Sequence, residues 1–415
     1  MTDSLLSGYR ALDLTDEKGF ICGKLLAALG VEVIKIERPG GDPSRMIPPY
    51  LDNDPDMGKS LYWLAFNTDK RSITLNIETA RGKDLFKQLV SKSDFVIESF
   101  QPGYLDNLGL GYEAISRINP RIIYTSITPF GQKGPYAHYA GSELIASAMG
   151  GIAATTGDPD RAPLREGPDA IYYESNAAAA VGTAMAHYYR EISGEGQQVD
   201  ISMQEVPIKR TASNLVVWEF DKKIIPRAGT VRTVGARSTH WIWPCKDGYI
   251  FWSYMGGKPG SQGNRAISKW MDDEGMDNPL RAIKNWEEFD MAAQDVSREV
   301  LEVQQNAIRK FFGRHTKKEI LEGGVKRGLN ACPVYNPADI LENDQLKARG
   351  YWSEIKDSKS GRKMKYPGYF FKSSVTENFV RSEAPVMGEY NDHIYKQELN
   401  LSDTEIREMK LGGII

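Results

Sequence analysis

The first third of the chain alternates short β-branched segments with helical stretches, and this order restricts the fold more than any other feature. Strand character recurs at residues 11–14, 31–36, 72–77, 95–97 and 121–127. Between them, apolar residues at helical spacing occupy residues 20–29 and 79–91. Strands separated by helices of this length form βαβ units, in which the strands run parallel. The sequence therefore predicts an α/β fold with a mainly parallel, doubly wound sheet.

The second half of the chain has a different texture, which predicts a second domain. Residues 241–254 are aromatic and β-branched, the stretch up to about residue 328 is polar and helix-rich, and strand character returns near 366–372. The length of 415 residues suits two domains, since a typical domain has about 100–200 residues. We predict a large α/β domain, a smaller α+β insert and a C-terminal return to the large domain.

Composition and charge exclude several classes of function. A net charge of −3 argues against a general nucleic-acid binder, which needs a basic surface to neutralise phosphates. No apolar run approaches the roughly 18 residues that a membrane-spanning helix needs. The three cysteines lie far apart and the five histidines have no metal-ligand spacing, so neither a disulfide framework nor a metal site is predicted. We expect a cytoplasmic protein.

Two loops carry residues that suit ligand binding. The segment 37–43 directly follows a predicted strand, and in doubly wound sheets ligands bind beyond the carboxyl ends of the strands. Arg38 in that loop suits a phosphate or an adenine ring, because a guanidinium pairs with the one and stacks on the other. The glycine-rich segment 256–260 predicts either a mobile lid or a plain hairpin connection. The residues alone name no reaction, since the dinucleotide-binding pattern GxGxxG does not follow the first strand.

Short motifs follow one another in order along most of the chain. They include Leu12–Thr15, Leu29–Glu37, Gly41–Arg45, Lys70–Leu75, Leu108–Tyr112, Phe130–Gln132, Gly194–Asp200 and Cys332–Val334. In this ordered set the chain resembles the class III CoA-transferases, the family of formyl-CoA transferase and carnitine CoA-transferase. The resemblance implies a Rossmann-like large domain from residues 1–220 and 330–415, with a small inserted domain and its linkers at residues 225–329. It also implies an interlocked dimer, and a CoA thioester as substrate in place of a permanently bound cofactor.

The resemblance further implies a catalytic aspartate, which attacks an acyl-CoA and then carries CoA as a thioester. In the family this aspartate lies nine residues after a proline and twenty-five before a glutamine, and counting from Pro163 and from Gln197 both lead to Tyr172. A phenol has no acyl carbon on which a thioester could form, and with an ordinary pKa of about 10 it is protonated at pH 7. No catalytic residue is therefore expected at this position. Glu174 is the nearest carboxylate that could substitute, and Asp169 is the next.

The family's contacts to CoA fall on Arg38, Leu75, Ser99, Phe100 and Gln101, and its lid loop falls on Gly256 and Gly257. Three departures lower the positive charge expected around the CoA phosphates. Gln101 and Asn107 occupy positions where arginine is common, and Glu78 occupies one where some members have a basic residue. A charge-assisted contact is worth roughly 1.5–3 kcal/mol, so CoA binding should be weaker in this chain. Arg38 is retained, which leaves weak CoA binding open.

Three functional hypotheses follow from the sequence. The first is a non-catalytic subunit that pairs with a homologous, aspartate-bearing chain in a hetero-oligomeric CoA-transferase. By resemblance to a two-subunit type within the family, that enzyme would move CoA between succinyl-CoA and a carboxylic acid such as benzylsuccinate, in anaerobic aromatic degradation. The second is an active homodimeric transferase that uses Glu174. The third is a CoA-thioester-binding protein without transferase chemistry.

Overall fold

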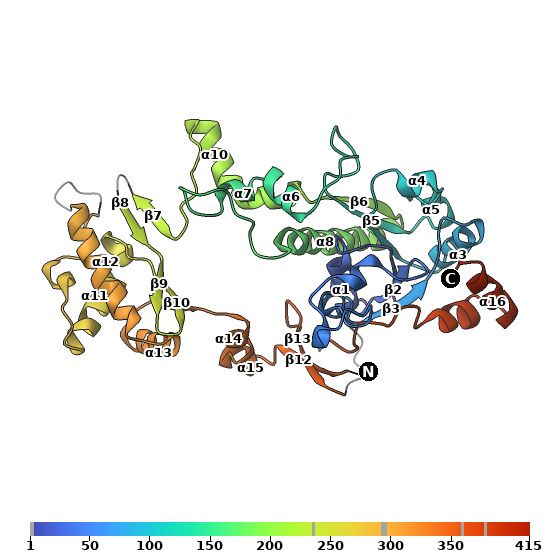
Figure 1. Ribbon diagram of the computed structural model, residues 1–415. Coiled ribbons are helices and arrows are strands. Elements are labelled where there is room, and N and C mark those ends of the chain that lie inside the picture. Colours follow the sequence, from blue (N-terminus) through green and yellow to red (C-terminus); the bar gives the residue numbers. More distant parts are fainter. Residues whose placement is uncertain (1–3, 235–236, 292–296, 358–360, 377–379) are drawn as a thin grey trace. The chain divides into compact units, whose positions relative to one another are not determined.

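A six-stranded parallel sheet forms the centre of the larger of two compact units (Figure 1). The computed structural model describes residues 4–234, 237–291, 297–357, 361–376 and 380–415. In spatial order the strands are β3 (Lys70–Thr74), β2 (Glu32–Glu37), β1 (Arg10–Asp13), β4 (Phe95–Glu98), β5 (Ile123–Thr128) and β6 (Gln197–Ser202). The predicted α/β fold with a parallel central sheet is confirmed.

The sequence patterns located five of these strands and missed β6. Four of them, β1, β2, β4 and β5, contain apolar or β-branched runs because both faces of the sheet are covered. The other edge strand, β3, is buried at four of its five residues. By contrast, β6 pairs only with β5, and its residues alternate between half-buried and exposed along most of its length. An edge strand of this kind has a weaker apolar pattern, which explains the omission.

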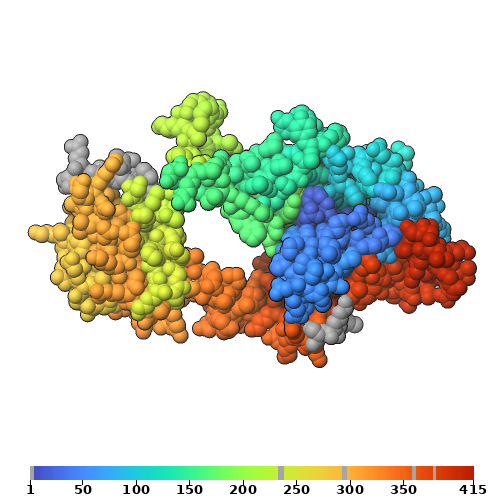
Figure 2. Space-filling model, in the orientation of Figure 1, coloured from blue at the N-terminus to red at the C-terminus, as the bar shows by residue number. Residues whose placement is uncertain are grey.

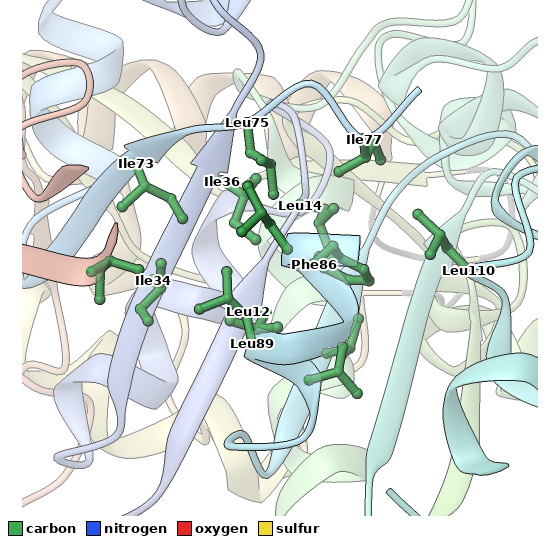
Figure 3. Close-up of a cluster of buried hydrophobic side chains, with 14 of the residues drawn as sticks. Leu12, Leu14, Ile34, Ile36, Ile73, Leu75, Ile77, Phe86, Leu89 and Leu110 are labelled. Atoms are coloured by element: carbon green, nitrogen blue, oxygen red, sulfur yellow. The ribbon is translucent and has the colours of Figure 1, made fainter. Parts of the chain in front are cut away.

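Successive residues of each strand point to opposite faces of the sheet, and both faces are packed. On one face, Leu12 and Ile34 meet Phe86 and Leu89 of α3 (Ala80–Val90), as Figure 3 shows. On the other face, their sequence neighbours Ala11 and Val33 join the core formed with α1 (Phe20–Ala28) and α8 (Ala170–Ser193).

The long helix α8 ends where a glycine permits a left-handed residue. Its C-terminus stops at Gly194, with φ of 80°, whose N–H donates to the Arg190 carbonyl oxygen. The Arg190 guanidinium is buried and donates to the carbonyl oxygens of Asp94 and Arg121, both at 3.1 Å. The helix is thereby joined to the segments that lead into β4 and β5.

The remaining helical segments that lie wholly or mostly in this unit, or at its boundary, are short. They are α2 (Leu61–Phe66), α4 (Tyr104–Asn107), α5 (Tyr112–Ile118), α6 (Glu143–Met149), α7 (Ile152–Thr155), α9 (Glu205–Ile208), α10 (Ala212–Asp221), α15 (Asp344–Ala348) and α16 (Asp403–Leu411). Single turns of 3₁₀ helix lie at Pro43–Met46, Leu51–Asn53 and Lys209–Thr211, and a π-helical turn lies at His393–Glu398.

The C-terminal residues belong to the larger unit. The larger unit contains the chain up to residue 153, residues 165–224 and residues 345–415. The Asn76 N–H donates to the Ile414 carbonyl oxygen at 2.7 Å, and the Tyr395 hydroxyl donates to the Thr74 carbonyl oxygen at 2.7 Å. In Figure 2 the red C-terminal segment lies beside blue segments from the first hundred residues. An antiparallel pair, β12 (Trp352–Lys356) and β13 (Lys363–Pro367), precedes them, so the strand expected near 366–372 ends earlier than predicted.

The smaller unit contains residues 154–164 and 225–344. It has a three-stranded antiparallel sheet of β9 (Ile242–Cys245), β10 (Gly248–Phe251) and β11 (Cys332–Val334), and a hairpin of β7 (Val231–Val234) and β8 (Arg237–His240). Its helices are α11 (Gly257–Asp273), α12 (Arg298–Gly313), α13 (Lys317–Arg327) and α14 (Pro337–Leu341), with a 3₁₀ turn at Pro279–Ala282. Trp243, Trp252, Phe311 and Phe312 form the centre of its core.

The glycine-rich segment 256–260 is not the flexible loop that its composition indicated. Gly256 is the N-cap of α11, and the residues from Gly257 onward form the first turn of that helix. A side chain at Gly256 would lie 2.4 Å from the Phe289 carbonyl oxygen, and one at Gly260 would lie 1.9 Å from that of Met255. These two glycines are therefore explained by close backbone approach at the start of a helix.

Within the described part of the chain, no helix combines the length and the apolar character needed to cross a membrane.

Candidate functional site

A cavity of about 450 Å³ opens at the carboxyl ends of β1, β2 and β3. Its walls include Leu14 after β1, Ile36–Pro39 at the end of β2, Leu75–Glu78 after β3, and Phe100 after β4. Three of the five predicted CoA-contacting residues, Arg38, Leu75 and Phe100, are thus brought together in one place. This is the edge of a parallel sheet at which ligands of doubly wound folds bind.

One wall of this cavity is aromatic. The Phe100 and Tyr104 rings lie against each other with centroids 4.7 Å apart and planes tilted by 30°. The Tyr104 hydroxyl donates to Glu78 Oε1 at 2.7 Å, and both residues line the cavity. Flat aromatic faces of this kind suit stacking on a planar heterocycle. The sequence reasoning missed Tyr104, although its spacing of four residues from Phe100 at the start of a helix was an available signal.

A buried ion pair between Arg45 and Glu37 stabilises the loop that carries Arg38. Two Arg45 nitrogens donate to the Glu37 carboxylate, each at 2.7 Å, and the Arg45 guanidinium lies 3.7 Å from the centre of the Trp63 ring. Burial by itself raises the pKa of Glu37, but hydrogen bonds from Arg45 and Ser72 lower it below its usual range. Glu37 is therefore ionised and neutralised by Arg45, while the exposed Arg38 side chain faces solvent.

Ser99 and Gln101 do not line this cavity. The Ser99 hydroxyl is buried; it accepts from the Asp16 N–H at 2.9 Å and donates to Asp16 Oδ1 at 2.8 Å. The Gln101 side chain is exposed, and its Nε2 donates to the His138 carbonyl oxygen at 2.6 Å, at the rim of a second hollow. Ser99 therefore connects the segment after β4 to the turn after β1. The role of Ser99 and Gln101 in CoA binding stays a prediction.

Tyr172 lies in the first turn of α8 with only 7% of its surface exposed. Its hydroxyl oxygen accepts a hydrogen bond from the Glu143 N–H at 3.3 Å. Burial, together with the Glu17 carboxylate, raises the pKa of Tyr172 well above its ordinary value. The phenol is consequently neutral at pH 7 and offers neither a carboxylate nor a phenolate at this position.

An asparagine fixes the backbone around Tyr172. Asn176 Nδ2 donates to the Tyr172 carbonyl oxygen at 2.7 Å and to the Lys18 carbonyl oxygen at 2.6 Å, while its Oδ1 accepts from the Cys22 N–H at 2.8 Å. One buried side chain thus joins α8 to α1 and to the turn between β1 and α1. These hydrogen bonds connect the start of α8, which carries Tyr172, to the segment that follows β1.

The carboxylates near Tyr172 in the chain, and that of Glu143, whose N–H contacts the Tyr172 hydroxyl, are already engaged in ion pairs. Arg165 donates to Glu143 at 2.7 Å and to Asp169 at 3.3 Å. Glu174 accepts from Arg210 at 2.7 Å, and the same guanidinium also pairs with Glu166. Such pairing stabilises the ionised form and orients the Glu174 carboxylate toward Arg210.

The remaining predicted site residues, Gly256 and Gly257, lie in the smaller unit. With Tyr254, Phe289 and Glu287 they line a hollow of about 310 Å³ within that unit. Whether the start of α11 moves as a lid stays a prediction. Among the described residues, no three histidine, cysteine, aspartate or glutamate side chains gather in a way that could hold a metal ion.

Comparison with known proteins identifies the family. The model of CoA-transferase family III matches residues 6–391. This chain belongs to CoA-transferase family III. The subunit BbsE of succinyl-CoA:(R)-benzylsuccinate CoA-transferase from Thauera aromatica is 33% identical over 94% of this chain and 93% of its own length. Formyl-CoA:oxalate CoA-transferase from Streptomyces coelicolor is 31% identical over the full length of both chains.

The fold of this family III chain is also found in a solved structure. A CAIB/BAIF family protein from Brucella suis superposes with a TM-score of 0.81 at 26% identity, covering 95% of this chain and 99% of the other. The resemblance inferred from the motifs is confirmed. Membership in the family makes CoA thioesters the expected substrates, and the cavity beside Arg38 and Phe100 brings together three of the predicted CoA-contacting residues.

Proposed function

We propose that this chain is the non-catalytic subunit of a hetero-oligomeric family III CoA-transferase, paired with a homologous chain that carries the catalytic aspartate. The observation that carries the proposal is the buried, neutral Tyr172 at the aspartate position. Transfer requires a carboxylate that attacks the acyl-CoA carbonyl and releases CoA thiolate, leaving a mixed anhydride. The thiolate then attacks the enzyme's carbonyl carbon and releases the acid. A phenol provides no such carbon.

The ion pair between Glu174 and Arg210 supports the same proposal. To act as nucleophile, Glu174 would have to leave Arg210 and lie where the aspartate of the family lies. Displacements of about 1 Å already cost on the order of 100-fold in rate. An ion pair that holds the carboxylate elsewhere therefore favours an inactive chain.

An exposed apolar stripe supports the pairing with a second chain. Val181, Met185, Tyr188 and Ile192 follow one another at helical spacing along α8 and are 59%, 68%, 71% and 69% exposed. Contiguous apolar surfaces of this kind mark sites of protein association. We propose that a homologous family III chain covers this stripe in an interlocked dimer, with most of the smaller unit inserted in the chain between residues 224 and 345 of the larger.

The donor is proposed to be succinyl-CoA and the acceptor an aromatic succinate such as benzylsuccinate. This assignment rests on the name of the relative BbsE, which is itself a subunit. The aromatic wall of Phe100 and Tyr104 supports binding of the CoA nucleotide to the larger unit of this chain. CoA is a substrate in this scheme, and no resident cofactor is invoked.

The test is covalent trapping in the separate and paired chains. Each sample is incubated with succinyl-CoA and treated with borohydride or hydroxylamine, and the modified residue is identified by mass spectrometry. We expect this chain to stay unmodified and its aspartate-bearing partner to be labelled. A Glu174→Gln variant is the matched control, and labelling of Glu174 in the isolated wild-type chain would overturn the proposal in favour of an active homodimer.

Native purification distinguishes the remaining alternative. A chain that purifies from its source as a self-sufficient homodimer, binds CoA and never exchanges it would be a CoA-thioester-binding protein. Co-purification with a second family III chain supports the subunit assignment.

A further inference from the structure

A buried carboxyl group lies directly behind the aromatic wall of the cavity. Glu98 is the last residue of β4 and is only 4% exposed. It faces a second hollow of about 410 Å³ in the larger unit, whose floor includes Tyr124 and Ser126 of β5. None of the sequence patterns or family positions considered above assigned a role to this glutamate.

The Glu98 carboxylate holds the backbone of the residue that forms the wall. Its Oε2 accepts from the Phe100 N–H at 2.8 Å, which closes a tight turn at the end of β4. Between the two residues, Ser99 is fastened to Asp16 in the turn after β1. Phe100 in turn packs on Tyr104, whose hydroxyl is held by Glu78. Contacts therefore run without interruption from Glu98 to the mouth of the cavity.

Burial brings the pKa of Glu98 close to neutrality. Burial raises the pKa of Glu98 to about 7, while the Ser126 hydroxyl and the Phe100 N–H lower it and the Asp106 and Asp16 carboxylates raise it. The groups that face it from the packed elements are Asp106 of α4, Asp16 of the β1–α1 turn and Tyr124 of β5, with Glu113, Lys133 and His138 lining the same hollow. The charge state of this one carboxyl group can therefore change between pH 6 and 8.

We propose that Glu98 is a positioning residue, which fixes Phe100 so that its ring forms a wall for the adenine nucleotide of CoA. The inference rests on the proposed binding of CoA to this chain. An ionised carboxylate accepts a hydrogen bond more strongly than a neutral acid, so the ionised form holds the Phe100 backbone more firmly. Nucleotide binding should consequently weaken as Glu98 becomes protonated.

Two variants and one matched control test this role. Glu98→Gln keeps an acceptor without the charge, and Glu98→Ala removes the acceptor. Glu113→Ala removes another carboxylate that lines the same hollow, whereas the Phe100 N–H donates to Glu98. CoA affinity is measured by calorimetry from pH 6 to 8, and hydrogen–deuterium exchange is followed in the peptide that contains Phe100 in the free protein.

In the wild type, we expect CoA affinity to fall by about 5-fold from pH 8 to pH 6 because a charge-assisted hydrogen bond becomes a neutral one. Glu98→Gln should lose that part of the pH dependence and bind at the low-pH level of the wild type. The CoA phosphates also titrate in this range, so the pH profile of Glu98→Gln serves as the reference from which the contribution of Glu98 is calculated. Glu98→Ala should bind about 10-fold more weakly and exchange faster at Phe100. Glu113→Ala should match the wild type.

Two results overturn the inference and can be told apart. If the wild type binds CoA and Glu98→Ala binds equally well with unchanged exchange at Phe100, the positioning role is refuted while the proposed function stands. If the wild type binds no CoA at any pH, the CoA part of the proposed function fails and the nucleotide role of Glu98 fails with it. In that second case, the exchange data still report whether Glu98 holds the loop.

Discussion

Replacing Tyr172 by phenylalanine tests whether the role of this tyrosine is structural or catalytic. The substitution removes a single oxygen, which accepts from the Glu143 N–H at 3.3 Å. The ring keeps its place among the residues between α8 and the sheet, where Tyr172 is 7% exposed. Among the residues that the structure describes, the hydroxyl therefore loses one long hydrogen bond to a backbone donor.

The expected loss of unfolding free energy is small. A typical intramolecular hydrogen bond contributes about 0.5–1.5 kcal/mol, and a distance of 3.3 Å exceeds the usual value of about 2.9–3.0 Å. Leaving the Glu143 N–H without this acceptor adds to the loss, whereas removing a buried hydroxyl offsets part of it. We expect Tyr172→Phe to lower the free energy of unfolding by about 1 kcal/mol.

The assay combines urea unfolding of the variant with transferase activity of the paired enzyme. Tyr173→Phe is the matched control, because Tyr173 is 46% exposed and its loss of a hydroxyl should change stability by less than about 0.5 kcal/mol. Both variants should retain wild-type activity. A fall in activity by tenfold or more at unchanged stability of Tyr172→Phe would show that the phenol takes part in the reaction and refute the reasoning.

Three further perturbations have definite expected outcomes. Glu37→Gln leaves the buried Arg45 charge without its partner and should lower the free energy of unfolding by about 3 kcal/mol or more, measured by urea unfolding. Glu98 has a pKa raised to about 7 in the folded chain, so its contribution to stability is fully present below about pH 4.5 and is lost as the pH rises through 7. Glu98→Gln should remove this fall of about 3 kcal/mol from the pH profile of unfolding. Ser402→Ala removes the capping box with Glu405 at the start of α16 and should cost about 1 kcal/mol, seen as faster amide exchange in that helix.

Each of these predictions has its own control or contradiction. Asp54→Asn breaks the exposed pair with Lys59 and should change stability by less than about 1 kcal/mol, in contrast to Glu37→Gln. A Glu98→Gln variant that keeps the wild-type pH profile would mean that Glu98 does not titrate in this range. Unchanged exchange in α16 after Ser402→Ala would mean that packing of Ile406 and Met409, and not the cap, determines the stability of that helix.

Local pattern was sufficient to predict most of the parallel sheet. The segments that became β1, β2, β4 and β5 contain short runs of apolar or β-branched residues, and the segment of β3 places Ile73, Leu75 and Ile77 at alternate positions. Both patterns are visible without any knowledge of the partner strands. The sequence patterns missed the edge strand β6 and predicted a loop where α11 starts. At α11, Gly256 and Gly260 have a composition typical of loops, yet close approach to the carbonyl oxygens of Phe289 and Met255 is what requires glycine there.

The amino-acid sequence by itself determined the family, the type of sheet and the absence of an aspartate at residue 172, because these depend on residue identity and order. Only the tertiary structure decided that Arg38, Leu75 and Phe100 line one cavity, while Gln101 lies at another. It also decided that Glu174 pairs with Arg210, and that Glu98 is buried against the Phe100 backbone. The physical reason is that burial, charge pairing and pKa depend on neighbours that are distant in the chain and come together only when the strands and helices pack.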